Sequence, residues 1–241
     1  QARLRSRLAL HFFTLGKRNN ALSESAFALR DARASCDTHA LAHALIARHA
    51  VLLGPDGLGE RSAIATELLE IATQLGDHEY MMRALALRVV NALEVGDIAP
   101  VHEATARHRR LADITRDPFE RWANLMWRCA RALLVGNFDE ATARANEGLE
   151  LTRNVPGPHA FEVNGPLAYL GQLVLIEDTR FSSALDPGLF DTARAEFEEV
   201  LAGRVARLQI LTRLERTSEV RDEIERLMAQ DLQNADRSGT W

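Results

Sequence analysis

Apolar residues recur at steps of three and four along almost the whole chain, and short turn signals interrupt them. This spacing places the apolar side chains on one face of an α-helix. Long runs of Val, Ile and Thr, which would predict a sheet, are missing. The pattern predicts helices over residues 2–15, 20–35, 38–53, 60–75, 78–95, 98–114, 118–135, 138–153, 161–177, 188–202, 204–214 and 218–230. We therefore expect an all-α protein of about twelve helices.

Residue types at the expected helix ends support these boundaries. Five glycines follow apolar helical stretches, where a left-handed residue commonly ends a helix: Gly16, Gly54, Gly76, Gly96 and Gly136. The pairs Asp37-Thr38 and Asp117-Pro118 have the chemistry of an N-cap followed by a first helical turn.

The chain also repeats itself with a period of about forty residues. At this offset four columns align: Leu45, Leu85 and Leu125; Arg48, Arg88 and Arg128; Leu53, Leu93 and Leu133; Gly96 and Gly136. Helical hairpins of this period cannot bury their apolar faces alone, so they stack on their neighbours.

The clearest single unit runs from residue 136 to 141 as Gly-Asn-Phe-Asp-Glu-Ala, followed by Gly-Leu-Glu-Leu at 148–151. It resembles the tetratricopeptide motif, which implies a right-handed αα-superhelix. We expect Phe138 to fill the gap between two helices, and Ala141 and Gly148 to be small where those helices lie closest. Other units depart from the motif, with His108 at the small position and Glu215 where glycine is expected.

We expect one tetratricopeptide-like domain over residues 1–241. Clusters of Asn, Gly and Pro at 154–158, 164–166 and 186–188 predict an irregular elbow near 154–188. A capping repeat would follow at about 189–230. The same breakers could instead mark a joint to a separate C-terminal cap.

Several longer phrases carry a narrower resemblance. They lie at residues 47–56, 67–72, 75–77, 83–85, 88–90, 93–97, 121–122 and 131–136. Together they resemble the helical-repeat region of large actinobacterial signal-transduction ATPases, which include ATP-dependent LuxR-type transcriptional regulators. The resemblance implies an ATPase module upstream, in some members a helix-turn-helix DNA-binding domain downstream, and a helical region that senses an inducer or partner.

Composition narrows the class of protein further. The formal net charge of −5 disfavours direct binding of nucleic acid. No apolar run is long enough to cross a bilayer. The two cysteines, which we expect to be buried thiols, suit a reducing cytoplasm. The chain begins without Met and inside a helical pattern, so we expect a segment of a longer protein.

No motif predicts catalysis, a cofactor or a metal site. The glycine-rich stretch at 54–61 lacks the Lys-Ser/Thr of a phosphate loop and is better explained as a connector between helices. His39, His43 and His49 lie on one helical stretch without a third metal ligand, and we expect them at the surface or at a cap.

The arginine column leaves two interpretations open. Stacked repeats could place it along a groove that binds carboxylates or phosphates, or each arginine could brace neighbouring helices through an acidic partner. The candidate groove residues are Arg48, Arg88, Asn91, Asn124, Trp127, Arg128 and Arg131.

The sequence therefore predicts a non-catalytic module of a larger cytoplasmic regulator, which binds a protein segment or a small effector. A self-association module, with a homodimer as one form, or a free-standing adaptor is the first alternative. A helical enzyme of unrecognised type is a remote one.

Overall fold

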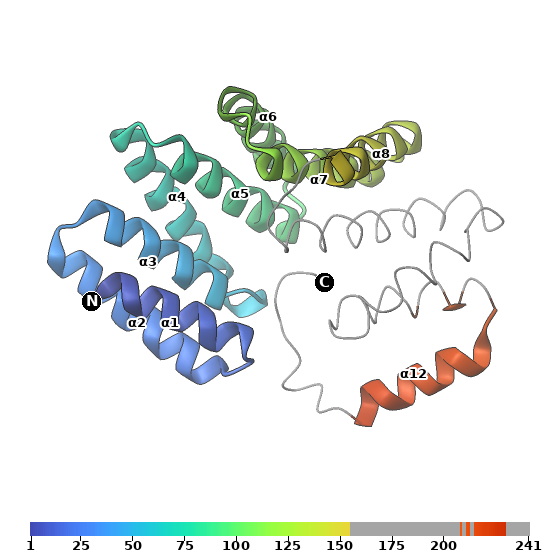
Figure 1. The fold of residues 1–241 in the computed structure, drawn as a ribbon, viewed down its shortest axis with the longest axis horizontal. Coiled ribbons are helices and arrows are strands. Elements are labelled where there is room, and N and C mark those ends of the chain that lie inside the picture. The colour runs from blue at the N-terminus through green and yellow to red at the C-terminus, as the bar shows by residue number, and fades with distance from the viewer. Residues whose placement is uncertain (155–207, 209–210, 213–214, 230–241) are drawn as a thin grey trace. The chain divides into compact units, whose positions relative to one another are not determined.

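The computed structural model describes residues 1–154, 208, 211–212 and 215–229. Within these ranges every regular element is helical and no strand occurs, which confirms the all-α prediction for this part of the chain. The elements are α1 (Ala2–Thr14), α2 (Arg18–Ser35), α3 (Thr38–Val51), the 3-10 helix η1 (Pro55–Gly57), α4 (Leu58–Leu75), α5 (His78–Val95), α6 (Ile98–Thr115), α7 (Pro118–Leu134), α8 (Phe138–Asn154) and α12 (Thr217–Ala229) (Figure 1).

The nine α-helices of the described part begin and end within two residues of their expected bounds. The helices expected at 161–177 and 188–202 lie outside the described residues, as does the elbow beyond residue 154. Of the expected capping repeat, only α12 and a few residues before it are described.

Aspartate side chains begin three of these helices. The carboxylates of Asp37, Asp77 and Asp117 each accept a hydrogen bond from the backbone N–H three residues further on. These bonds satisfy amide groups that have no partner inside the helix. The N-caps predicted at Asp37 and Asp117 are confirmed.

Glycines with a left-handed backbone follow four helices, with φ between +66° and +72° at Gly16, Gly76, Gly96 and Gly136, as predicted. Gly54 is different, and the expectation that it ends a helix in the left-handed conformation is wrong. Its φ of 126° and ψ of 165° belong to an extended connection that leads into η1, because α3 already ends at Val51. Three other residues also have left-handed backbones, namely Cys36, Arg116 and Glu215.

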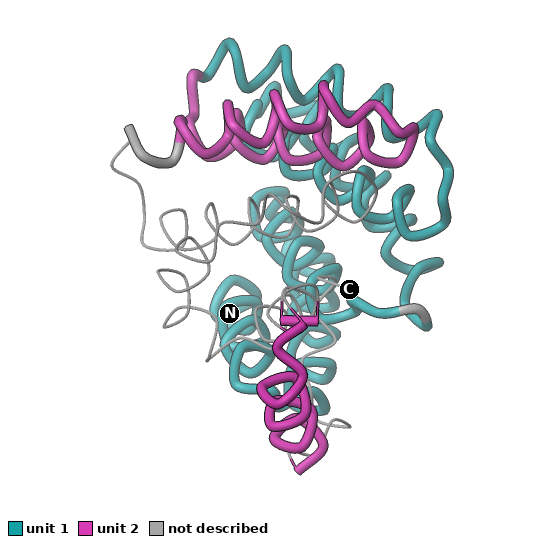
Figure 2. The backbone as a smooth tube through the Cα atoms, turned by 90° about the vertical axis from the view of Figure 1, so that its right-hand side faces the viewer, with its two compact units in different colours: residues 1–115, 236–241 teal, residues 116–235 magenta. Residues whose placement is uncertain are grey.

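The chain divides into two compact units, and the boundary falls between α6 and α7 after Thr115 (Figure 2). In the first unit α3 packs against both α1 and α2, and α5 packs against α4 and α6. In the second unit α7 packs against α8. Consecutive helices thus form hairpins within each unit. The expectation of one continuous domain over residues 1–241 stays a prediction.

Burial repeats every forty residues, like the sequence. One buried column contains Ala9, His49, Val89 and Cys129, and a second contains Ala21, Arg61, Val101 and Ala141. Members of the two columns meet where the helices of a hairpin approach each other: Ala9 and Ala21 share an apolar cluster, and the Cys129 thiol donates to the Ala141 carbonyl at 3.2 Å. The hairpins therefore share one packing arrangement. In α1/α2, α5/α6 and α7/α8, small or apolar residues occupy the position where the two helices come closest.

The hairpin formed by α7 and α8 has the predicted close approach. Ala141 and Gly148 are both buried. A Cβ atom added to Gly148 would lie 2.5 Å from Cε of Met126 on α7. A larger residue at this position would therefore force Met126 to move.

Candidate functional site

The hairpin of α3 and α4 departs from the shared packing arrangement at its centre. Where the other hairpins have small or apolar residues, it has His49 on α3 and Arg61 on α4. The Arg61 side chain is completely buried, and only 2% of His49 is exposed. Burying a guanidinium group is costly unless its donors find acceptors. The contacts of Arg61 therefore decide how this hairpin holds together.

Arg61 connects three segments of the first unit. Its Nη1 donates to Oδ1 of Asn91 on α5 at 3.0 Å, and its Nη2 donates to the carbonyl oxygen of Gly54 at 3.2 Å. Nη2 also forms an ion pair with the carboxylate of Glu94 on α5, whose side chain is about one third exposed. A single buried cation thus ties α4 to α5 and to the connector after α3.

His49 completes this cluster as a neutral donor. An arginine can only donate, so the Asn91 atom it contacts must be the carbonyl oxygen. The same oxygen lies 3.1 Å from Nε2 of His49, which must therefore carry a proton and donate as well. Burial lowers the pKa of His49 to about 4, although its hydrogen bond to Asn91 acts in the opposite direction. At neutral pH the cluster therefore has one cation, Arg61, and one carboxylate, Glu94.

Two donors of the cluster have no hydrogen-bond acceptor, namely Nε of Arg61 and Nδ2 of Asn91, and both atoms are buried. The geometry is that of a buried polar brace between α3, α4 and α5. His49 is not at the surface, so the sequence-based expectation for this histidine is wrong. Neither Arg61 nor Glu94 was predicted as a site residue, although Arg61 is the one charged residue in a column with Ala21, Val101 and Ala141.

The predicted candidate Arg48 also joins three helices. Its guanidinium forms a bidentate pair with Glu60 on α4, through Nε at 2.7 Å and Nη2 at 3.1 Å. Its Nη1 donates to Ser25 and to the carbonyl oxygen of Leu22, both on α2. Arg48 on α3 is therefore directed towards the second helices of two successive hairpins.

The other predicted candidates lie in different surroundings. Arg88 is half-buried on α5 and makes no hydrogen bond or ion pair with a described residue, whereas Asn91 belongs to the buried cluster. On α7, Asn124 is buried, Trp127, Arg128 and Arg131 are half-buried, and none of the four lacks a partner. Arg131 lies 3.7 Å from the carboxylate of Glu140 on α8. Of the predicted candidates, Asn91 is the one that contacts the buried cluster of Arg61, His49 and Glu94.

A second polar group combines side chains of α1, α3 and α5, and we call it the first-helix face. It consists of Arg3, Arg7, His39, His43 and Tyr80. The ring of Tyr80 lies 5.8 Å from the ring centroids of both His39 and His43. Its hydroxyl is 3.2 Å from Nε2 of His43. Desolvation lowers the pKa of His43, and the positive charges of Arg3 and Arg7 act in the same direction.

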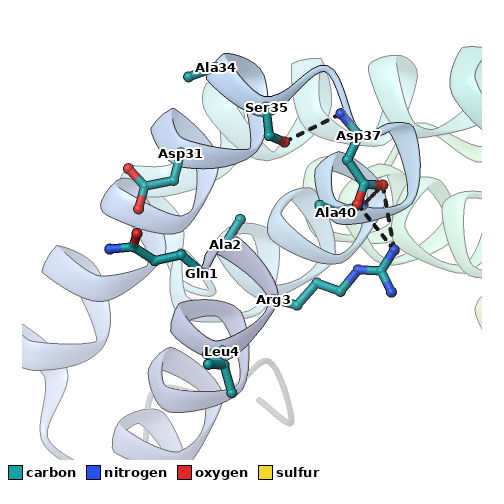
Figure 3. A pocket seen from close by; sticks show the side chains of 9 residues that line it. All are labelled: Gln1, Ala2, Arg3, Leu4, Asp31, Ala34, Ser35, Asp37 and Ala40. Atoms are coloured by element: carbon teal, nitrogen blue, oxygen red, sulfur yellow. Dashed lines mark hydrogen bonds and ion pairs between the residues drawn. The ribbon is translucent and has the colours of Figure 1, made fainter.

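An open hollow of about 470 Å³ lies beside this face, between the start of α1 and the connection from α2 to α3 (Figure 3). Arg3 reaches from α1 to the Asp37 carboxylate at 3.3 Å across its edge. Asp31 and Ser35 of α2 line another side. Both partners of the Arg3–Asp37 pair are exposed, so the pair itself contributes little stability.

The two cysteines lie in different environments. Cys129 is buried, but Cys36 is exposed at the end of α2, so the expectation of two buried thiols is wrong for Cys36. Burial raises the pKa of Cys129 to about 11. Within the described residues no group of three His, Cys, Asp or Glu side chains could hold a metal ion.

No protein-family model matches the chain, and no curated protein matches it. Among the described helices, none is long and apolar enough to cross a membrane.

Proposed function

We propose that this chain is a non-catalytic binding module of a larger regulator, and that the first-helix face is its binding surface. The observation that carries the proposal is the packing of Tyr80 on α5 against His39 and His43 of α3, within the electrostatic reach of Arg3 and Arg7 on α1. Helices are rigid elements, and the ring contacts fix the positions of His39 and His43 before any partner arrives. A preorganised surface loses less conformational entropy when it binds.

The chemistry of this face suits a protein segment or a small effector with acceptor groups. Arginine and tyrosine contribute strongly to binding surfaces because each combines a large contact area with polar atoms. Arg7 makes no hydrogen bond or ion pair within the described part of the chain, and Arg3 is held only by an exposed pair. Both guanidinium groups can therefore turn towards a ligand at little cost. Arg88 is similarly available on α5.

Site-specific photo-crosslinking tests this proposal in the full chain. A photoreactive amino acid at His43 should capture a partner in cell extract, and the same group at the exposed Arg109 of α6 should not. Replacing Arg3 and Arg7 by alanine should then abolish capture from position 43. Equal capture from both positions would contradict a binding role for this face. An enzymatic activity that co-purifies with the chain and is lost in its variants would contradict the proposal that the module is non-catalytic.

The resemblance to signal-transduction ATPases supports a cytoplasmic sensor arm within this proposal. An ATPase module would precede the chain, and a DNA-binding domain could follow it. Sequencing the coding DNA on both sides tests this part separately. A GxxxxGK[ST] motif upstream supports it, and an open reading frame confined to this chain would contradict it.

A further inference from the structure

Two leucines of α1, together with the leucine at its C-cap, form an exposed row. Leu4, Leu8 and Leu15 are 72%, 39% and 54% exposed. Separations of four and seven residues place the three side chains along one side of a helix. The opposite side of α1 is buried through Ala2, Ser6 and Ala9. The leucine row therefore faces away from the hairpin to which α1 belongs.

The equivalent side of α3 is a packing surface. Forty residues after Leu4 and His11 stand Ala44 and Val51, which are both fully buried. Ala44 belongs to an apolar cluster with Ala2, Ala28 and Ala32 of the preceding hairpin, and Val51 to one with Ala9 and Ala21. Arg48, forty residues after Leu8, contacts α2. In α3 this side thus receives a neighbouring hairpin, whereas in α1 it is uncovered.

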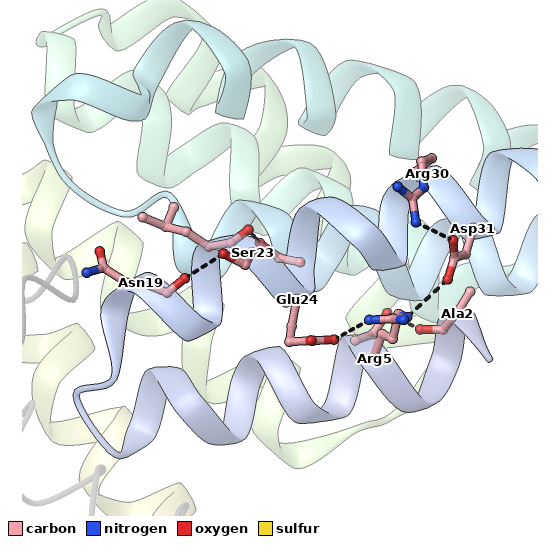
Figure 4. Close-up of polar contacts among 10 residues, drawn as sticks. Ala2, Arg5, Asn19, Ser23, Glu24, Arg30 and Asp31 are labelled. Carbon is pink, nitrogen blue, oxygen red and sulfur yellow. Dashed lines mark hydrogen bonds and ion pairs between the residues drawn. The ribbon is translucent and has the colours of Figure 1, made fainter.

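One arginine of α1, beside the leucine row, has no acidic partner within the described residues. Between Ala2 and Thr14, α1 has three arginines and no acidic residue. Arg3 pairs with Asp37 at 3.3 Å. Arg5 pairs with Glu24 at 2.8 Å and with Asp31 at 3.1 Å on α2 (Figure 4). Arg7 makes no such pair within the described ranges. A helix that covers the row should therefore combine an apolar stripe with acidic residues.

Helix α12 of the same chain has this chemistry. Ile224 and Met228 are 44% and 73% exposed and lie four residues apart, on one side of the helix. From Thr217 to Ala229 the helix contains four carboxylates and two arginines. Glu219 and Glu223 are paired with Arg216 and Arg226, but Asp222 and Glu225 make no ion pair with a described residue. α12 is thus an acidic helix with an uncovered apolar stripe.

We propose that the chain associates head to tail, with the Ile224–Met228 stripe of one copy packed on the leucine row of another. Both surfaces are removed from water, and the carboxylates of α12 without a described partner, Asp222 and Glu225, meet Arg7 of α1, which likewise has no described partner. The contact uses different surfaces on the two copies. Each added copy therefore leaves one α1 and one α12 open, and assemblies should grow with concentration. A contact between two α1 helices would instead bring arginines of like charge together.

Two variants that each block one end test this arrangement. Leu4→Asp places a carboxylate opposite the acidic α12, and Met228→Arg places a cation opposite the basic α1. Sedimentation velocity should show the unaltered chain growing beyond one copy as concentration rises, and less so at high salt because the charges are screened. Each variant alone should remain a single copy. A mixture of the two should form a dimer that grows no further, because each variant supplies the surface the other has kept.

Ile114→Asp on α6 and Leu134→Arg on α7 are matched controls, since both residues are comparably exposed. They should assemble like the unaltered chain, and circular dichroism should show that all four variants fold. The proposal is overturned if the unaltered chain stays a single copy at the highest concentration. It is also overturned if Met228→Arg still assembles alone, or if the mixture does not pair. If the chain stays a single copy but Leu4→Asp abolishes binding to vesicles of anionic lipid, the leucine row is a membrane surface instead.

Discussion

Replacing Arg61 by methionine tests whether the buried cluster holds α3, α4 and α5 together. The change removes the charge and all five donors but keeps most of the volume, so little cavity is created. Three hydrogen bonds of a charged donor disappear, each with a net worth of about 1.5–3 kcal/mol. Two terms offset this loss. Glu94 is one third exposed and returns to water, and the cost of burying the guanidinium, several kcal/mol, is no longer incurred.

We therefore expect Arg61→Met to lower the free energy of unfolding by about 2–3 kcal/mol. This is less than the 3–5 kcal/mol typical of breaking a pair whose remaining partner is fully buried. Urea denaturation followed by circular dichroism measures the change. Hydrogen exchange resolved by peptide should locate faster exchange in α3, α4 and α5. Arg109→Met is the control, because its pair with Asp113 at 3.8 Å is exposed and should contribute at most about 0.5 kcal/mol.

Equal stability of the Arg61 and Arg109 variants would refute the bracing role of the cluster. A triple variant, Arg61→Met with His49→Leu and Asn91→Leu, sharpens the test. It removes the three buried polar side chains together and leaves Glu94 free to turn to water, so we expect it to recover most of the loss or to exceed the unaltered chain. If the triple variant unfolds more easily than Arg61→Met alone, the polar atoms hold the hairpin in a way that apolar packing does not replace.

Three further outcomes can be measured by the same denaturation assay. Gly57→Ala should destabilise the chain by about 1–3 kcal/mol, because its Cβ would lie 2.2 Å from the backbone oxygen of Leu52. Gly59→Ala has open space around the new Cβ, so it should be neutral or stabilise the chain by up to about 1 kcal/mol. Cys36→Gly should stabilise by about 0.5–1 kcal/mol and Gly76→Ala should destabilise by a similar amount, since both residues have left-handed backbones. Acidification from pH 7 to pH 4 should remove about 3 kcal/mol through His49, whose pKa falls from 6.5 to about 4 on folding. The unfolded chain takes up this proton first, so the stability is present above pH 6.5 and is lost between pH 6.5 and 4; His49→Gln should remove this part of the pH dependence.

Each of these expectations has a clear contrary result. If Gly57→Ala and Gly59→Ala behave alike, the approach of the connector to η1 is not close in solution. If Cys36→Gly destabilises the chain, the backbone of Cys36 at the end of α2 is not left-handed in solution. An unchanged pH profile in His49→Gln would mean that other groups cause the acid sensitivity.

The helices of the described residues were predictable from the sequence because their causes are local. Apolar spacing, the capping carboxylate of Asp37 and the glycine at Gly76 act within one or two turns of the residues they organise. The forty-residue columns predicted repeated hairpins before any contact was known. A further column at the same offset, which was not among the four that predicted the hairpins, contained a signal for the buried cluster, since Arg61 is the charged residue beside Ala21 and Ala141.

The contacts that could carry function were decided by tertiary structure. The sequence left Arg48 as either a ligand-binding or a bracing residue, and only the fold brings Glu60 and Ser25 within reach of its guanidinium. The burial of His49 depends on Asn91, forty-two residues away. Which side of α1 stays uncovered likewise follows from how hairpins stack, because a helical pattern marks an apolar side but not the neighbour that covers it. Local chemistry thus fixed the helices of this protein, and long-range packing alone decided which of their side chains meet.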